Sequence, residues 1–156
     1  MIIRILSIAV LCLGIICGCS SMGCDNNRNS IPMAGFYDYK TKESLNVRGM
    51  AVSGVGAPND SLLLDPARSA HQVYLPFRGN KTETSFLFSS GNVADVVTFK
   101  YESFPYFDGE ECGAMWRYKI TEVEFSGELL DSISVVDADI TNIERERIMI
   151  FLTATE

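Results

Sequence analysis

Hydrophobic and polar residues alternate along most of the chain after residue 35, a pattern typical of half-buried β-strands. In the segment 73–77, Val73, Leu75 and Phe77 face one way, and Pro76 indicates an edge strand because proline cannot donate a hydrogen bond to a neighbour. The run 90–92, Ser-Gly-Asn, lies between two alternating segments and predicts a hairpin. The predicted strands are 45–51, 73–77, 84–89, 94–101, 114–125, 132–136 and 147–153.

Seven short strands separated by turns predict an all-β fold, a single antiparallel β-sandwich of immunoglobulin-like size. No segment sustains a helical period, and 140–146 offers at most one turn of helix. The alternation also assigns faces within strands. It places Leu45, Val47, Gly49 and Ala51 on one face of the first strand, and Ala114, Trp116, Tyr118 and Ile120 on one face of the fifth.

An apolar run from Ile5 to Ile16 follows Arg4 at the start of the chain. It is shorter than the ~20 residues that a membrane-spanning helix needs, and it suits a signal peptide. The run ends at Gly18 and Cys19, where a small residue precedes a thiol that can be alkylated with diacylglycerol. The alternatives are an ordinary secretory signal or an N-terminal anchor helix. The sequence therefore predicts a lipoprotein signal peptide at 1–18, a tether at 19–34 with lipid on Cys19, and a β-sandwich domain at 35–156.

Removal of residues 1–18 leaves 138 of the 156 residues, enough for one domain with its own core. Since Arg4 is the only charged residue of the leader, the mature chain has a formal charge of −8, against −7 for the whole chain. Such an acidic surface repels phosphate backbones, which excludes nucleic acid as a partner. We expect the lipid to hold the domain at the outer membrane facing the periplasm, because Ser20 and Ser21 give no sorting signal.

Five cysteines divide into three groups after cleavage. Cys12 and Cys17 leave with the leader, Cys19 carries the lipid, and Cys24 and Cys112 remain. Outside the cytoplasm a remaining pair usually oxidises, and chain entropy gives the disulfide roughly 4 kcal/mol at best. The alternative is a reactive or metal-binding thiol, which would need a nearby basic residue or further ligands.

Catalytic and metal-binding patterns are weak. His71 is the only histidine, and the sequence has no Gly-x-Ser-x-Gly, Ser-x-x-Lys or His-Glu-x-x-His motif to accompany it. Read as a calcium loop, the segment that starts at Asp137 has Asn142 instead of the turn glycine and Ile148 instead of the closing glutamate. We therefore expect no enzyme activity, no cofactor and no metal.

The aromatic run Phe104-Pro105-Tyr106-Phe107 is the most suggestive candidate for a binding site. It is predicted to be a loop between two strands, and an acidic turn follows it. Three interpretations stay open, namely closure of the core, a patch for a protein partner, and a platform for stacking sugar rings. The candidate binding residues are Tyr101, Phe104, Tyr106, Phe107, Asp108 and Glu110.

Several runs together resemble small uncharacterised lipoproteins of Bacteroidetes-type Gram-negative bacteria, a family with a domain of unknown function. The resemblance implies a disulfide between an early cysteine and a later Glu-Cys-Gly, which fits Cys24 and Cys112, and it implies no activity. The runs are 35–40 (Gly-Phe-Tyr-Asp-Tyr-Lys), 54–62 (Gly-Val-Gly-Ala-Pro-Asn-Asp-Ser-Leu), 111–113 (Glu-Cys-Gly), 131–133 (Asp-Ser-Ile) and 148–151 (Ile-Met-Ile-Phe).

The sequence thus predicts a membrane-anchored envelope lipoprotein with a non-catalytic role as an accessory or assembly factor. Its expected partners are the lipid bilayer, through acylated Cys19, and an envelope protein. The alternative is a glycan-binding module that uses the aromatic run.

Overall fold

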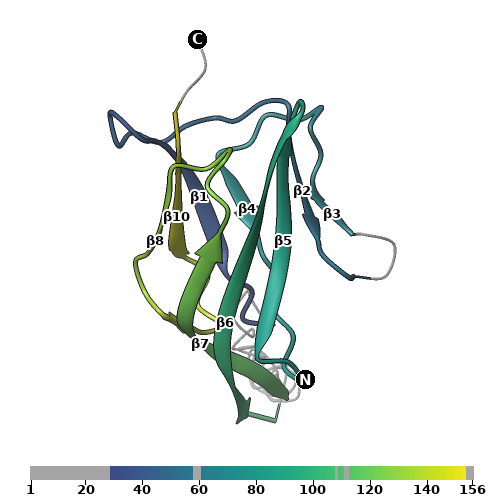
Figure 1. Ribbon diagram of the computed structural model, residues 1–156. Coiled ribbons are helices and arrows are strands. Elements are labelled where there is room, and N and C mark those ends of the chain that lie inside the picture. Colours follow the sequence, from purple (N-terminus) through teal and green to yellow (C-terminus); the bar gives the residue numbers. More distant parts are fainter. Residues whose placement is uncertain (1–28, 58–60, 108, 111–112, 154–156) are drawn as a thin grey trace, which may run out of the picture.

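The computed structural model describes residues 29–57, 61–107, 109–110 and 113–153, and within them the chain is all-β. Two sheets pack face to face as a sandwich (Figure 1). The smaller sheet contains β1 (Met33–Asp38), β4 (Gln72–Tyr74), β8 (Ser132–Val135) and β10 (Glu146–Leu152), in the order β4-β1-β10-β8. The larger sheet contains β2 (Met50–Gly54), β3 (Leu62–Leu64), β5 (Glu83–Ser90), β6 (Val93–Phe107), β7 (Ala114–Phe125) and β9 (Asp139–Ile140), in the order β3-β2-β5-β6-β7-β9.

The core lies between the sheets, where alternate residues of each strand meet. The predicted sandwich is therefore confirmed. Large apolar side chains that are fully buried come from strands of both sheets, and they are Phe36, Ile148 and Ile150 from the smaller one and Val52, Phe86, Phe88, Val97, Phe99 and Ile140 from the larger one.

Strand direction differs from the prediction at one pair. β1 and β10 run parallel, with Phe36 opposite Ile150, while every other pair of described strands is antiparallel. Nearly the whole domain separates these two strands in sequence. Because the alternation of side chains is the same in parallel and antiparallel strands, the sequence pattern carried no sign of this pairing.

The hairpin between β5 and β6 confirms the prediction, since Ser90 pairs with Val93 around the turn residues Gly91 and Asn92. Gly91 has a φ of 58°, a conformation that glycine adopts without steric cost. The segment 73–77 is confirmed in part: Val73, Leu75 and Phe77 are buried and β4 is an edge strand, but β4 ends at Tyr74, before Leu75.

The first predicted strand, 45–51, is wrong in its bounds and its face. Gly49 has a φ of 75°, which interrupts the extended chain, and β2 begins at Met50. The pattern had placed Ala51 on the same face as Val47. The structure instead buries its two neighbours, Met50 and Val52, so the inward face of β2 is the opposite one. The short strands β3 and β9 and the first strand β1 were also missed, and β1 begins at Met33, inside the predicted tether.

A β-bulge in β7 changes the face of its side chains. Lys100 pairs with Glu122 but the next residue, Tyr101, pairs with Ile120, so Thr121 is the extra residue. Ile120 and Tyr118 are buried as predicted, but Trp116 is 42% exposed. There the β6–β7 hairpin extends past the smaller sheet, as the lower part of Figure 1 shows.

Tyr101 belongs to the core, and this corrects its assignment to a surface patch. Its side chain is 2% exposed, and its ring stacks on Phe77 with 4.4 Å between centroids. The hydroxyl accepts a hydrogen bond from the backbone N–H of Arg78 at 3.1 Å and lies 2.7 Å from Oγ1 of Thr84. Tyr101 thereby attaches β6 to the segment that follows β4.

Tyr101→Phe should lower the free energy of unfolding by about 1–2 kcal/mol, because the stacked ring stays while the N–H of Arg78 loses its acceptor. Urea denaturation followed by circular dichroism measures this change. Tyr39→Phe is the matched control, since the Tyr39 side chain is 43% exposed and its hydroxyl can be solvated. Equal stability of the two variants would contradict the role of the Tyr101 hydroxyl.

Candidate functional site

The aromatic run 104–107 is the end of strand β6 and not a loop, which corrects the prediction. Phe104 pairs with Arg117, and Phe107 pairs with Ala114 across the hairpin. Aromatic residues favour extended chain, and Pro105 is tolerated because β5 pairs with β6 only as far as Lys100. This part of β6 is therefore an edge, and its side chains alternate between two faces.

The alternation divides the predicted patch. Phe104 and Tyr106 lie on one face with Arg117, whereas Phe107 lies on the other face with Trp116. Phe104 is 46% exposed and Phe107 is 63% exposed. Of the two acidic candidates, Glu110 is exposed and Asp108 lies outside the described residues. Of the five predicted residues that the structure describes, it brings together Phe104 and Tyr106 only.

We call the hollow beside these two residues the hairpin-face pocket. The guanidinium carbon of Arg117 lies 3.3 Å from the centroid of the Tyr106 ring, a cation–π contact. One terminal nitrogen of Arg117 donates to the side-chain oxygen of Asn142 at 3.3 Å, while its Nε is buried without a hydrogen bond to any described residue. The pocket has a volume of about 390 Å3 and is lined by Phe104, Pro105, Tyr106, Arg117, Tyr118, Asp139, Ile140 and Thr141.

The segment 137–139, which the sequence analysis considered as part of a calcium loop, supports the wall of this pocket. The carboxylate of Asp137 accepts hydrogen bonds from Arg145 and Arg147 and from the N–H of Asp139 at 3.0 Å. The bond from that N–H, together with the two arginine charges, holds the pKa of Asp137 below its usual value despite partial burial. Arg147 is 3% exposed and also donates to the Asp139 carbonyl and to Thr141, so it fixes the segment that lines the pocket.

Comparison with known proteins gives one match. A family model described as a family of unknown function, DUF6452, matches residues 46–152. The chain belongs to this family. The match includes every strand from β2 to β10, and with them the β6–β7 hairpin and the pocket wall at 137–141. No curated protein and no solved structure matches the chain.

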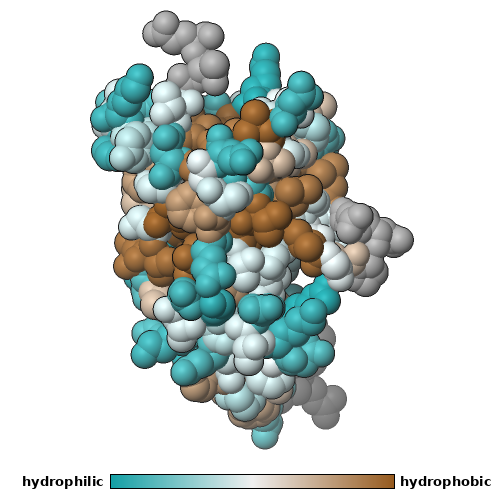
Figure 2. Space-filling model, viewed as in Figure 1, coloured by the Kyte–Doolittle hydropathy of each residue, from teal (hydrophilic) through white to brown (hydrophobic). Residues whose placement is uncertain are grey.

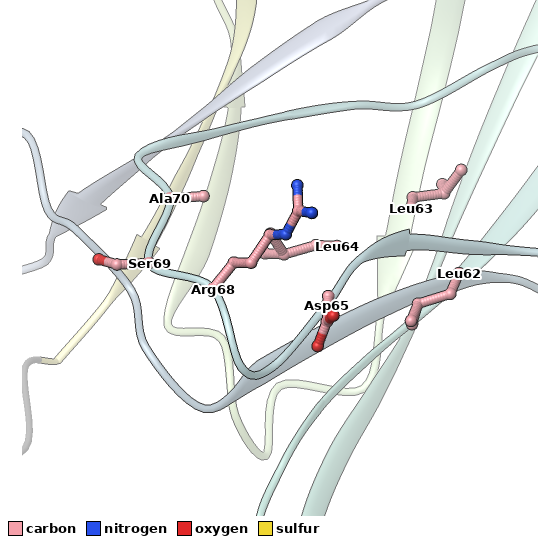
Figure 3. A pocket seen from close by; sticks show the side chains of 7 residues that line it. All are labelled: Leu62, Leu63, Leu64, Asp65, Arg68, Ser69 and Ala70. Carbon is pink, nitrogen blue, oxygen red and sulfur yellow. The ribbon is translucent and has the colours of Figure 1, made fainter.

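Another hollow of this DUF6452 protein lies against the connection from β3 to β4 and has a volume of about 480 Å3. Figure 3 shows Arg68 and Asp65 pointing in different directions, and all seven lining residues belong to the single segment 62–70. The carboxylate of Asp65 accepts a hydrogen bond from the backbone N–H of Ala67 at 2.9 Å, as in an Asx turn. We therefore assign this hollow to the loop structure and not to a ligand.

The outer face of the larger sheet carries a second apolar surface. Figure 2 shows hydrophobic residues in a band across the middle of this face. Leu87 and Val96 are cross-strand partners there, and Val96 is 44% exposed. Next to them Lys100 forms ion pairs with Glu122 and Glu124 at 3.0 and 2.6 Å. These exposed residues are aliphatic or already paired, so the hairpin-face pocket is the better candidate.

The other predicted site residues add no group to the DUF6452 pocket. His71 is exposed at the bend before β4, and its carbonyl accepts the N–H of Phe36. Among the described residues, no three His, Cys, Asp or Glu side chains are grouped so as to hold a metal ion, and no helix is long and apolar enough to cross a membrane. Cys19, Cys24 and Cys112 lie outside the described residues, so the lipid and the disulfide stay predictions.

Arg117 is a central residue of the pocket that was not among the candidate binding residues. The alternation placed Arg117 on the face opposite to Trp116 and Tyr118, and its proximity to Tyr106 depends on the pairing of β6 with β7. The bulge at Thr121 shifts that register by one residue relative to a regular hairpin.

Proposed function

We propose that this DUF6452 protein is a lipid-anchored, non-catalytic binding protein of the bacterial cell envelope, acting as an accessory or assembly factor. Its partner would be an envelope protein that contacts the hairpin-face pocket. The observation that carries the proposal is the cluster of Phe104, Tyr106 and Arg117 at the exposed edge of the larger sheet. The lipid on Cys19 would hold the domain at the outer membrane, facing the periplasm.

The composition of the pocket supports a protein partner. Tyrosine and arginine are enriched among the residues that contribute most to binding at protein interfaces. Stacking on Tyr106 holds the Arg117 guanidinium in place before binding, which reduces the entropy that a partner must overcome. Phe104 offers an exposed apolar ring directly beside it. A partner would bind by packing an apolar side chain on Phe104 and offering an oxygen acceptor to Arg117.

The edge of the sheet supports the same proposal. β9 has two residues, and within the described chain it pairs with β7 only at Tyr118 and Lys119. The part of β7 that carries Arg117 is therefore not covered by β9. Backbone groups along such an edge can bind an extended peptide, with neighbouring pockets giving specificity. We infer that the partner presents an extended segment to this edge.

The double variant Phe104→Ala/Arg117→Ala should lower the recovery of the partner at least about tenfold, because two anchor residues are worth more than about 1.4 kcal/mol together. The measurement is crosslinking in intact cells, followed by affinity purification of the tagged full chain and quantitative mass spectrometry. Leu62→Ala is the matched control, since Leu62 is 57% exposed on β3 at the opposite edge of the same sheet. Unchanged recovery with the double variant would refute the proposed surface.

A glycan partner is the second candidate, and one observation favours it. The rings of Phe104 and Tyr106 border the same pocket as Asp139 and Thr141, so a stacking surface lies beside groups that can bind sugar hydroxyls. The same purification separates the two. Recovery of polysaccharide, and not of a stoichiometric protein, would indicate a glycan-binding module. In that case the double variant should no longer recover the polysaccharide.

A further inference from the structure

Two exposed aromatic side chains lie on the other face of the hairpin, and we call them the aromatic tip. Phe107 is 63% exposed and Trp116 is 42% exposed. They share a face because Phe107 pairs with Ala114, and Trp116 is two residues further along β7. The two rings therefore face away from the hairpin-face pocket.

The Trp116 ring has a defined position on this face. It lies over Gly79, where an added Cβ would come within 2.3 Å of two ring carbons. The absence of a side chain at Gly79 lets the ring lie flat on the segment that follows β4. Trp116 is thus held in place while much of its surface stays exposed.

The chain enters the domain at the same end. Asn29, the first described residue, lines one hollow together with Ala114 and Trp116. Cys19 precedes Asn29 by ten residues, which span at most about 36 Å when fully extended. A lipid on Cys19 would therefore keep this end of the domain close to the bilayer. The β5–β6 turn lies at the opposite end, at the top of Figure 1.

We propose that the aromatic tip inserts into the interface of the membrane to which Cys19 is anchored. Tryptophan and phenylalanine suit this layer because an amphipathic or apolar ring can sit between headgroups and acyl chains. The contact would orient the domain, with the β6–β7 end toward the lipid and the hairpin-face pocket directed to the side. This inference rests on the lipid anchor of the proposed function and adds a second contact with the bilayer.

Charge does not drive this contact. Glu110 is exposed beside the tip, and the mature chain is acidic, so an anionic surface would repel it. The contact would depend instead on apolar area and on the high local concentration that the tether provides. It should therefore form on zwitterionic vesicles and be insensitive to salt.

Trp116 is the only tryptophan of the chain and reports on its own environment. The acylated full chain is reconstituted into phosphatidylcholine vesicles whose acyl chains carry bromine, and binding is checked by flotation. Since interfacial side chains reach ~5–10 Å into this layer, we expect at least about a twofold loss of emission relative to unbrominated vesicles. The loss should be the same at low and high salt.

A matched control moves the tryptophan to the other end of the same strand, by the substitutions Trp116→Phe and Val93→Trp. Val93 is 39% exposed at the β5–β6 turn, and fourteen residues of β6 place it roughly 45 Å from Phe107. Its emission should not change with bromine. If the protein floats with the vesicles but Trp116 emission is not quenched, the proposed orientation is wrong and the lipid anchor is still supported. The same holds if tryptophan is quenched equally at positions 116 and 93. Absence of flotation would overturn the anchor itself, and the inference with it.

Discussion

Phe77→Ala should lower the free energy of unfolding by about 3–5 kcal/mol, the range found for buried phenylalanine removed from a core. Phe77 is 8% exposed and lies in the segment after β4, where the chain passes from the smaller sheet to the larger one. Its ring contacts four others. The centroids of Tyr101, Phe99, Tyr118 and Phe86 lie 4.4, 5.6, 5.6 and 6.5 Å away.

Urea denaturation followed by circular dichroism measures this loss. Phe107→Ala removes the same side chain from a position that is 63% exposed, so it should change stability by less than about 0.5 kcal/mol. A loss below about 1 kcal/mol for Phe77→Ala would mean that the aromatic cluster repacks around the gap, and the role of Phe77 as its centre would be wrong.

Asp95→Ala should destabilise the domain by at least about 3 kcal/mol, because it leaves the Ser126 hydroxyl and three backbone N–H groups without their acceptor. The carboxylate is fully buried and accepts hydrogen bonds from the Ser126 hydroxyl at 2.5 Å and from the N–H groups of Glu128, Leu129 and Leu130 at 2.9, 2.9 and 2.7 Å. Asp95 thereby holds the turn that connects β7 in the larger sheet with β8 in the smaller one.

The same carboxylate makes stability depend on pH. Burial alone would raise the pKa of Asp95, but the bonds from Ser126 and from the backbone outweigh it and hold the pKa below its usual value. A lowered folded-state pKa contributes stability that is complete above the unfolded-state pKa, about 3.9, and that is lost as the pH falls through the folded-state pKa. Wild-type protein should therefore lose this contribution below about pH 4.

Asp95→Asn should remove that part of the acid dependence while it lowers stability at neutral pH, since an amide cannot accept all four bonds. Denaturation curves between neutral pH and about pH 3 test this. Asp131→Asn, at an exposed carboxylate that accepts a hydrogen bond from Thr153, is the control. An unchanged acid dependence in Asp95→Asn would show that other groups cause it.

The sequence pattern predicted those strands whose two faces differ clearly in polarity. The β5–β6 hairpin and the strands β4 and β8 follow the alternation, and the predicted bounds agree within two residues or fewer at most ends. β10 was predicted from its continuous apolar run and does not alternate, since Ile150 and Phe151 are both buried. β1 was missed because Ala34, Gly35 and Phe36 are all buried, so the segment shows no alternation. β3 and β9 are too short for any period to be recognised.

The candidate site was predicted less well, for two physical reasons. An aromatic run next to an acidic turn resembles an exposed loop, but the same residues extend a strand when a partner strand lies beside them. Tyr101 was grouped with Phe104 because the two are close in sequence, yet the former faces the core and the latter faces outward. Nearness in sequence says little about nearness on a strand, since successive side chains point to opposite faces.

The all-β class and the two-sheet sandwich could be read from the amino-acid pattern, because both follow from local alternation and the need to bury apolar faces. It also predicted the lipid anchor, which depends on a short linear motif. Three features became visible only in the folded chain: the parallel pairing of β1 with β10, the division of the aromatic run between two faces, and the position of Arg117 on Tyr106. These depend on register and on contacts between distant segments, and a period of two residues carries no information about either.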